Sequence, residues 1–597
     1  MSILLFVQRH GLISISALAL LTACGDGINN SNTLSGTVID GYIEGAKVCL
    51  DVNKDGLCGA AEPTASTDAQ GRYSLDITGL NASGLTLIAE IPDSAKDADD
   101  GGQTLAAAGK SGYTMATLAD RPGVITPLTT LLVGKVQNGP LDVAQASAQV
   151  LAQLGLPSDT DLHADHVAKG NDLVQGTARQ LAGRLQALQK DAQLDNVGKR
   201  LTALLAQDHV LGQVVGAPTT LANLPDSLAG ADGQLLTYRM ISAKGKPIVA
   251  SALLFKPKSA APAGGWPLVV FGHGTVGVAR QCAPSVVLRS NGAWDYAPLV
   301  ASLIAQGVAV VAPDYEGLGP ADLGVPEGHP YLDLRSAGQA MVLAAVAAKN
   351  TLAADLSGAW AALGHSQGGH AALAAAQFAG LASQRSPGLR YLGAVAVAPA
   401  SNLNLSLNTL WAGIVGAQVA DYPAAYSATA IMNLYSAYLA KGSQSTPHPI
   451  DASTLFGTRM KAVYDARVGS TCLDGFLQAI SGSIGEHAAT AGATPSSYAG
   501  MMPAVINNSP RIGQLLAANE PGQIRLPGKT LLVQGSADAT VLPSITQQLL
   551  ATMKNKGSQV SLSLHEGDAA THSGVLAIPA AQQAIAGHLI QLFAPAP

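Results

Sequence analysis

Charged and aromatic residues are scarce in this 597-residue chain, at 12% and 4% of its sequence. Because hydrophobic residues reach 48%, the chain is able to bury large cores, which excludes a protein dominated by disorder. A surplus of basic residues is also missing: the net charge is −6, and this excludes nucleic acid as a partner. The length predicts more than one domain.

Long apolar runs are absent after the first residues, so we expect no membrane-spanning helix there. The first residues contain the apolar run "GLISISALALLTACGDG", which is too short to span a bilayer. Its segment Leu21-Thr22-Ala23-Cys24 resembles the lipobox of bacterial lipoproteins, in which small residues precede the cleavage site and a cysteine carries the lipid. We expect a lipoprotein signal peptide over residues 1–23, lipidation of Cys24 and attachment to a membrane through that lipid. The expected destination is the outer membrane, on its periplasmic or cell-surface face. The alternative is an ordinary signal peptide that contains a cysteine.

Cysteine is rare as well, with five residues in the chain. Export leads to an oxidising compartment, and an even number of cysteines follows Cys24, so we expect disulfides. The cysteines concerned are Cys49, Cys58, Cys282 and Cys472.

The N-terminal part of the chain divides into three segments by residue pattern. Residues 24–33 are polar and glycine-rich, which predicts a tether. Residues 34–100 alternate short apolar runs with Gly, Asp and Asn turns and resemble the small β-sandwich modules of secreted bacterial proteins. Residues 101–215 place apolar residues three and four apart, which predicts a helical region that serves as a spacer or packing collar.

Apolar strand candidates alternate with helical segments in residues 216–597. This alternation predicts an α/β fold whose mostly parallel sheet is covered on both faces. The strand candidates are residues 267–274, 307–315, 359–366, 391–400, 529–538 and 559–567. A mostly helical, loop-rich insertion at 401–520 interrupts the alternation, and we interpret it as a cap or lid.

One serine lies in Gly364-His365-Ser366-Gln367-Gly368, between a predicted strand and a predicted helix. It is the only serine in the chain with glycines both two residues before and two residues after it. At such a turn the serine is held in a strained conformation, and the glycines are needed because larger side chains would collide. We therefore predict that Ser366 is a nucleophile; the alternative is a flexible glycine bend.

A serine nucleophile needs a base to take its proton and an acid to orient that base. On this fold the expected order along the chain is Ser, then Asp or Glu, then His. Asp538, in "LLVQGSADATVLP", follows a strand candidate and is the predicted acid, with a simple Asp turn as the alternative. His572 is the predicted base because it lies in a loop, whereas His565 ends a strand and His588 lies in a helical pattern.

Negative charge that develops on a substrate oxygen needs N–H donors aimed at it. One predicted donor is the backbone N–H of Gln367, directly after the nucleophile. The other comes from "VVFGHGTVG", where we favour Thr275 and then Gly274. Nearby histidines are expected to hold the loop or to pack rather than to catalyse: His273, His365 and His370.

Five segments, taken in order, resemble the secretory lipase family of α/β-hydrolases over roughly residues 225–590. They are "FGHGTVGVARQCAPS", "VVAPDYEGLG", "HPYLDLRSAGQA", "GHSQGGHAAL" and "LLVQGSADATVLP". The resemblance implies an α/β-hydrolase fold, a triad of Ser366, Asp538 and His572, and hydrolysis of carboxylic esters. It also implies that the cap shapes the acyl pocket and gates access to it.

The chain departs from this family in its first oxyanion loop. The best-studied fungal members carry an acidic side chain there, where this chain has His273-Gly274-Thr275-Val276. The difference favours activity like that of an esterase over lipase activity that depends strongly on a lipid–water interface. In the family, the cysteine of the Cys-Ala-Pro-Ser motif is commonly disulfide-bonded, which implies a bridge from Cys282 to Cys472 that pins the cap to the core.

Residues 51–62, "DVNKDGLCGAAE", match the spacing of a calcium-binding loop with glycine in its sixth place. The expected ligands are the side chains of Asp51, Asn53, Asp55 and Glu62 and the carbonyl of Leu57. The flanks are predicted strands, and a disulfide between Cys49 and Cys58 would close the same loop. The alternative is therefore an Asx-rich turn stapled by that bridge. A bound calcium would be structural, and no cofactor is expected for catalysis.

The leading functional hypothesis is an exported serine esterase or lipase that acts on a small-molecule or lipid ester. The second is a non-catalytic surface binding or adhesion protein with a degenerate hydrolase body. Intact Ser, Asp and His residues in the expected order argue against degeneracy. A peptidase or a polyester depolymerase is a further alternative on the same triad.

Overall fold

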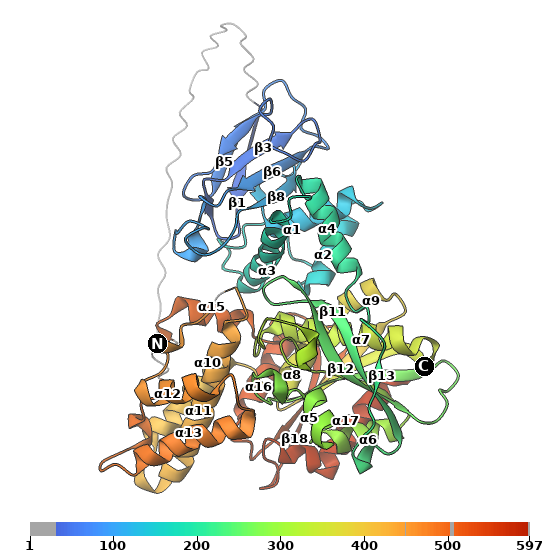
Figure 1. Ribbon diagram of the computed structural model, residues 1–597, viewed down its shortest axis with the longest axis vertical. Helices are drawn as coiled ribbons and strands as arrows, with labels where there is room; N and C mark the ends of the chain where they lie inside the picture. Colours follow the sequence, from blue (N-terminus) through green and yellow to red (C-terminus); the bar gives the residue numbers. More distant parts are fainter. Residues whose placement is uncertain (1–31, 448, 502–506, 595–597) are drawn as a thin grey trace, which may run out of the picture.

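The structure is a computed structural model that describes residues 32–447, 449–501 and 507–594. The predicted signal peptide, Cys24 and residues 24–31 of the predicted tether lie outside the described residues. In Figure 1 an N-terminal unit of strands and helices, in blue and teal, sits on a larger α/β unit. A group of helices in orange lies at one side of that larger unit.

The N-terminal unit contains two small sheets, with strand orders β5-β1-β9 and β4-β3-β6-β8, and a two-stranded ribbon, β2-β7. Short strands with alternating burial, such as Arg72–Asp76, form these sheets because one face is buried and the other is solvated. The strands are β1 Thr33–Val38, β2 Ile43–Glu44, β3 Lys47–Asp51, β4 Thr64–Ser66, β5 Arg72–Asp76, β6 Thr86–Ile91, β7 Lys96–Asp97, β8 Tyr113–Leu118 and β9 Val124–Ile125.

The predicted boundary between the β module and the helical region, at residue 100, is wrong. Strand β8 pairs antiparallel with β6 along its whole length, and β9 pairs with β1, so the sheets extend to Ile125. The strand "YTMATL" is six residues long and lies within the segment predicted to be helical. Its place in the sheet comes from partners more than 20 residues earlier in the chain, which local periodicity does not reveal.

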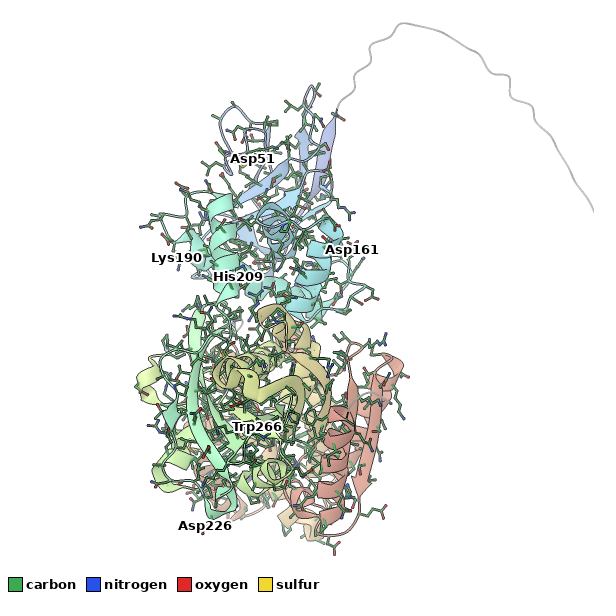
Figure 2. The ribbon with its side chains drawn as sticks, turned by 90° about the vertical axis from the view of Figure 1, so that its right-hand side faces the viewer. Asp51, Asp161, Lys190, His209, Asp226 and Trp266 are labelled. Atoms are coloured by element: carbon green, nitrogen blue, oxygen red, sulfur yellow. A yellow bond between two sulfur atoms is a disulfide. The ribbon has the colours of Figure 1, made fainter. Side chains whose placement is uncertain are left out.

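Four helices follow: α1 Pro127–Gln137, α2 Val143–Leu154, α3 Asp172–Gln189 and α4 Val197–His209. Their apolar faces and the buried side chains of the sheets form one core, which includes Leu87, Leu131 and Leu181. The helices also contact the larger unit, since Gln377 Nε2 donates to Gly155 O at 2.9 Å. Figure 2 shows this stacking from the side, so the helices connect the sheets to the α/β unit.

The α/β unit is built on a nine-stranded sheet with the order β10-β11-β12-β14-β13-β15-β16-β17-β18. The pairs from β14 to β18 are parallel, whereas β10, β11 and β12 are antiparallel additions at one edge. The strands are β10 Thr219–Thr220, β11 Ala231–Ile241, β12 Pro247–Pro257, β13 Trp266–Gly272, β14 Ala309–Pro313, β15 Leu356–His365, β16 Arg390–Val397, β17 Lys529–Gly535 and β18 Gln559–His565. The predicted fold class is confirmed, and all six strand candidates form parallel strands.

Helices cover both faces of the large sheet. One face carries α7 Leu334–Leu352, α8 Gln367–Gln377 and α9 Ala379–Arg385, whose alanines and leucines pack against the strands. The other face carries α5 Pro284–Asn291, α6 Ala297–Ala305 and α17 Pro579–Phe593. A further helix, α16 Pro543–Asn555, connects β17 to β18. Because β14 and β15 flank β13 on opposite sides, the carboxyl ends of these strands form a switch point at which ligands bind in open α/β sheets.

The orange helices in Figure 1 are the insertion between β16 and β17. They are α10 Leu403–Gly416, α11 Tyr422–Ser443, α12 Thr458–Arg467, α13 Leu473–Ala488 and α15 Pro510–Ala518, and they form a core of their own. Both predicted disulfides are formed, and the Cys282–Cys472 bridge ties this cap to the α/β unit. Among the described residues, none of the helices has both the length and the hydropathy that crossing a membrane requires.

Glu316, directly after β14, is a carboxyl group fully buried in the α/β unit. Its oxygens accept hydrogen bonds from Ala243 N–H at 2.9 Å and from Ser336 Oγ at 2.5 Å. Burial outweighs these bonds and raises the pKa of Glu316 to about 8. The folded state therefore keeps a proton that the unfolded chain releases near its ordinary pKa.

We expect the free energy of unfolding to fall as pH rises towards 8, because the unfolded state binds fewer protons there. Glu316 contributes at most about 1.4 kcal/mol per pH unit to this fall. The variant Glu316→Gln retains one donor and one acceptor but has no proton to lose, so its advantage over the wild type should grow with pH. Urea unfolding of both proteins at about pH 5 and about pH 8 checks this. An unchanged difference between the two proteins would contradict it.

Candidate active site

Ser366 occupies a sharp turn between β15 and α8. Its backbone has φ 58° and ψ −117°, a strained conformation for a residue with a side chain, and its N–H donates to Val397 O at 2.8 Å. A Cβ on Gly364 would overlap the carbonyl oxygen of Gly368, and a Cβ on Gly368 would overlap that of Gly272. The turn thus places the serine at the carboxyl end of the central strand, and the two glycines are required for it to form.

Asp538 and His572 come together although 34 residues separate them. His572 Nδ1 lies 2.8 Å from Asp538 Oδ2, and Gln534 Nε2 donates to the same oxygen at 3.0 Å. The other oxygen accepts the N–H groups of Thr540 and Val541 at 2.8 and 2.9 Å. Burial raises the pKa of Asp538, but the bond and the charge of His572 together with these N–H donors outweigh it, and the net pKa is lowered. An ionised Asp538 holds the proton of His572 on Nδ1 and leaves Nε2 free to accept one.

The loop that carries His572 lies against the serine turn. His365, the residue before Ser366, donates from Nε2 to the backbone oxygen of His572 at 2.9 Å, and the two imidazole rings are 4.7 Å apart. Within the described residues Ser366 Oγ makes no hydrogen bond, so its bond to His572 Nε2 is not formed in this state. Bonds between nucleophile and base are often long without substrate and tighten when it binds.

The two predicted N–H donors lie at the same end of the sheet. Gln367 is the first residue of α8, where backbone N–H groups have no acceptor within the helix. The N–H of Gly274 is already bonded to the hydroxyl of Tyr296 at 3.0 Å, which leaves Thr275 as the donor from this loop. The Thr275 side chain is fixed by a 2.8 Å bond to the Tyr331 hydroxyl.

Four other histidines have structural partners. His273 Nδ1 lies 2.7 Å from Gly274 O, so it holds its own loop, and His370 Nε2 lies 2.9 Å from Asn519 O. His565 bonds to Ser563 at 3.0 Å, and His588 contacts Lys529 O at 3.3 Å from within α17. None of these bonds involves Asp538.

Three residues around the site were not predicted from the sequence: Tyr296, His329 and Tyr331. His329 Nδ1 lies 2.9 Å from Glu316 O, and its Nε2 lies 2.8 Å from the side-chain nitrogen of Gln367. His329 and Tyr331 belong to the segment "HPYLDLRSAGQA", which was noted for its resemblance but carried no assigned role. Tyr296 had no local signal, because its partners are distant in the chain.

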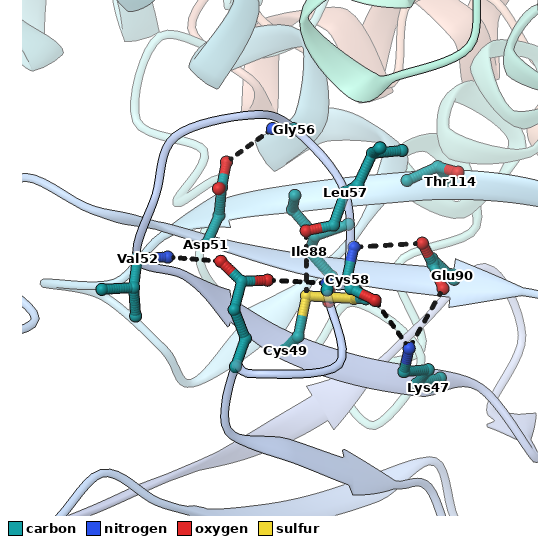
Figure 3. The surroundings of a disulfide bond; sticks show 12 residues. Lys47, Cys49, Asp51, Val52, Gly56, Leu57, Cys58, Ile88, Glu90 and Thr114 are labelled. Carbon is teal, nitrogen blue, oxygen red and sulfur yellow. Dashed lines mark hydrogen bonds and ion pairs between the residues drawn. A yellow bond between two sulfur atoms is a disulfide. The ribbon is translucent and has the colours of Figure 1, made fainter.

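The predicted calcium loop lies in the N-terminal unit, where the Cys49–Cys58 disulfide closes it (Figure 3). The loop's side chains accept backbone hydrogen bonds: Asp51 from Gly56 N–H at 3.1 Å, and Glu62 from Val52 N–H at 2.8 Å. Asn53 and Asp55 do the same as Asx turns, with the N–H groups of Asp55 and Leu57 at 3.0 and 2.9 Å.

The loop has the Asx turns and the disulfide of the stapled turn named above, and both are also compatible with a bound cation. One oxygen of Asp51, Oδ1, is buried and has no hydrogen-bond partner within the described residues. In the described parts of the chain, no three His, Cys, Asp or Glu side chains are grouped closely enough to hold a metal ion. Because an ionised carboxylate has about four acceptor sites, these N–H bonds do not exclude a cation, and calcium binding stays a prediction.

Comparison with known proteins agrees with the fold described above. A family model described as the alpha/beta hydrolase family matches residues 269–583. No curated protein matches the chain. A solved structure of a putative hydrolase from Legionella pneumophila is 16% identical with a TM-score of 0.50, over 64% of this chain and 98% of that one.

Two further solved structures are similar to the chain. The rice cell wall degrading esterase LipA from Xanthomonas oryzae is 20% identical with a TM-score of 0.47, over 64% of this chain and 99% of that one. Candida antarctica lipase A is 16% identical with a TM-score of 0.45, over 65% of this chain and 84% of that one. At these identities the likeness concerns the fold.

Proposed function

The chain belongs to the alpha/beta hydrolase family, and from this premise we propose that it is a serine carboxylic ester hydrolase that acts through an acyl-enzyme on Ser366. The observation that carries the proposal is the pairing of Asp538 with His572 beside the strained turn of Ser366. An ionised acid, an oriented imidazole and a serine held on a strained turn beside them form the arrangement that nucleophilic acyl transfer needs.

The proposed reaction has two steps that use the same groups. In the first, His572 Nε2 takes the proton of Ser366 Oγ as the oxygen attacks the ester carbon, and the alcohol leaves with that proton. In the second, His572 Nε2 takes a proton from a water molecule as its oxygen attacks the acyl carbon, and that proton passes to Ser366 Oγ as the acid leaves. The N–H groups of Gln367 and Thr275 stabilise the oxyanion in both steps, and Asp538 stabilises the imidazolium.

The side chains of the cap favour a substrate whose acyl group is apolar. Tyr435 of α11 packs against the apolar core of the cap, and burial, followed by the charge of Asp538, raises the pKa of its hydroxyl. Another cap tyrosine, Tyr438, packs against Tyr331 with ring centres 5.5 Å apart. The apolar core of the cap therefore packs against Tyr331 of the α/β unit, and we take this apolar cover to favour a carboxylic ester with an apolar acyl chain.

Hydrolysis of p-nitrophenyl esters of graded chain length tests the proposal, with a p-nitroanilide series as the comparison. We expect turnover of the esters and little of the anilides, with an optimum chain length set by the cap. Faster cleavage of the anilides would favour the peptidase alternative. No turnover of any substrate by well-folded protein would favour the non-catalytic binding protein.

We further propose that the protein is an exported lipoprotein anchored through Cys24. The lipobox-like segment supports this, and the two disulfides fit an oxidising compartment. Growth with a labelled fatty acid should label the wild-type protein and leave Cys24→Ser unlabelled. Label in both proteins would contradict the assignment of Cys24.

Ester hydrolysis should also be independent of metal ions. The proposed chemistry uses only protein groups, and the predicted calcium loop lies in the N-terminal unit rather than beside Ser366. We expect kcat to remain unchanged after dialysis against EDTA, as measured with the best p-nitrophenyl ester. A loss of activity that added calcium restores would contradict this expectation. A calorimetric titration with calcium tests binding to the loop separately.

A further inference from the structure

A chain of hydrogen bonds connects the loop that carries the second oxyanion donor to the loop that carries the base. It starts at Gly274 N–H, which donates to the Tyr296 hydroxyl at 3.0 Å. The same hydroxyl lies 2.9 Å from His365 Nδ1. On the opposite side of the imidazole, His365 Nε2 lies 2.9 Å from the backbone oxygen of His572. These four residues come from four separate segments, and none of the first three is part of the triad.

The chemistry of the groups fixes the direction of every bond in this chain. A backbone oxygen only accepts, so His365 carries its proton on Nε2 and donates it to His572 O. His365 Nδ1 is then an acceptor, and the Tyr296 hydroxyl must donate to it. The hydroxyl oxygen keeps a lone pair that accepts the N–H of Gly274. No group in the chain is left without a complementary partner.

The histidine at the centre of this chain is held neutral and immobile. Its side chain is 4% exposed, and burial lowers the pKa of His365 to about 3. Tyr296 is held in turn by the ring of Phe271, with ring centres 5.0 Å apart. A Cβ on Gly274 would overlap the Tyr296 hydroxyl, so only glycine permits this approach. The hydrogen-bond chain should therefore persist at neutral pH, because His365 stays neutral there.

We propose that His365 is a positioning residue that sets the relative placement of the catalytic base and the second oxyanion donor. Through Nε2 it holds the backbone of His572, and through Tyr296 it holds Gly274. Because Gly274 N–H is bound to Tyr296, the next N–H, that of Thr275, is the one left to bind the oxyanion. This role rests on the proposed function, since it assigns His365 a purpose only if Ser366 and His572 carry out acyl transfer.

A neutral imidazole suits this position better than other side chains. It offers one donor and one acceptor on opposite edges of a rigid ring, and it keeps them without a change of charge. The backbone of His365 is fixed as the last residue of β15, so the ring has a defined origin. A shift of its two partners by about 1 Å is enough to reduce turnover on the order of 100-fold.

Two variants test the proposal in the full-length protein. His365→Phe keeps the ring but removes both of its hydrogen bonds, and Tyr296→Phe removes only the hydroxyl. The matched control is Tyr391→Phe, because the Tyr391 hydroxyl is buried without a partner in the described part of the chain. We expect kcat to fall about 10- to 100-fold in the first two variants, with KM nearly unchanged, and to stay at the wild-type value in the control.

Two further readouts separate positioning from mere stability. Rates are normalised to the concentration of folded sites, from circular dichroism and active-site titration. A boronic acid that forms a tetrahedral adduct should bind less tightly to Tyr296→Phe in proportion to the loss of kcat, because the oxyanion donor is misplaced. The kcat of the double variant His365→Phe/Tyr296→Phe should be little lower than that of the less active single variant, because both substitutions interrupt one chain of hydrogen bonds. Should His365→Phe fail to fold, Tyr296→Phe still gives both readouts.

The result that overturns the inference is full kcat and full affinity for the boronic acid in both folded variants. If the wild-type protein hydrolyses esters and reacts at Ser366 in the active-site titration, the proposed function survives and only the role of His365 fails. If the wild type neither hydrolyses esters nor reacts at Ser366, the proposed function fails and the role of His365 fails with it.

Discussion

Ser366→Ala should lower kcat for ester hydrolysis by about 10⁶-fold, the loss measured when the nucleophile of a serine hydrolase is removed. The turn should survive, since alanine has the same Cβ and the collisions that require glycine concern Gly364 and Gly368. KM and the thermal midpoint should therefore change little. Steady-state rates on the preferred p-nitrophenyl ester measure the effect, with unfolding followed by circular dichroism.

Ser401→Ala is the matched control for this prediction. Ser401 is buried close to the same turn, and its hydroxyl has no hydrogen-bond partner within the described residues. Its loss should leave kcat at the wild-type value. Equal activity of Ser366→Ala and the wild type would remove the serine from the mechanism. An equal loss in both variants would point to general damage at the turn.

Asp538→Asn should lower kcat by about 10⁴-fold, as the equivalent change does in serine proteases. The two N–H groups of Thr540 and Val541 would keep the amide oxygen facing them, so the amide nitrogen would face His572. An N–H donor at that place faces Nδ1 and forces the imidazole proton onto Nε2. The protonated Nε2 can no longer accept the proton of Ser366. The fold should be retained because the side chain keeps its shape.

Glu316→Gln is the control for the loss of a buried carboxyl group. It neutralises an acid that lies outside the proposed machinery, so kcat at neutral pH should be unchanged. Rates of both variants should be compared after active-site titration. Activity of Asp538→Asn within about tenfold of the wild type would contradict the assignment of Asp538 as the orienting acid.

The elements predicted best from the sequence are those whose requirements are local. The serine turn needs glycine at two fixed offsets, so the pattern around Ser366 predicted its backbone conformation correctly. The six parallel strands are buried on both faces and appear as continuous apolar runs. Their alternation with helices predicted a mostly parallel sheet, and the α/β fold is confirmed, whereas the order of the strands in the sheet was not predicted.

The elements that were missed depend on partners that are distant in the chain. Strands β11 and β12 form an antiparallel hairpin near one edge of the sheet, and polar residues such as Thr237 and Ser251 interrupt their apolar residues. The role of Tyr296 depends on Gly274 and on His365, which is 69 residues away. Neither a local period nor a motif brings these three residues together; the fold does.

The calcium-like loop shows a different limit of sequence analysis. Oxygen side chains at alternate positions suit a cation, but they equally suit Asx turns that accept backbone N–H groups. In the structure Asn53 and Asp55 make such turns, and the disulfide closes the loop. The spacing alone does not distinguish the two uses, because both place oxygens towards the inside of the same loop.

The central claim is that Ser366 is the activated nucleophile of this chain. Treatment with a fluorophosphonate, which reacts with serines that an adjacent base activates, tests it directly when intact-mass and peptide mass spectrometry follow. We expect one adduct per chain, on the peptide that contains Ser366, with parallel loss of ester hydrolysis. His572→Ala should react far more slowly. An active protein whose adduct lies on another residue, or that stays unlabelled while its hydrolysis continues, would contradict the account.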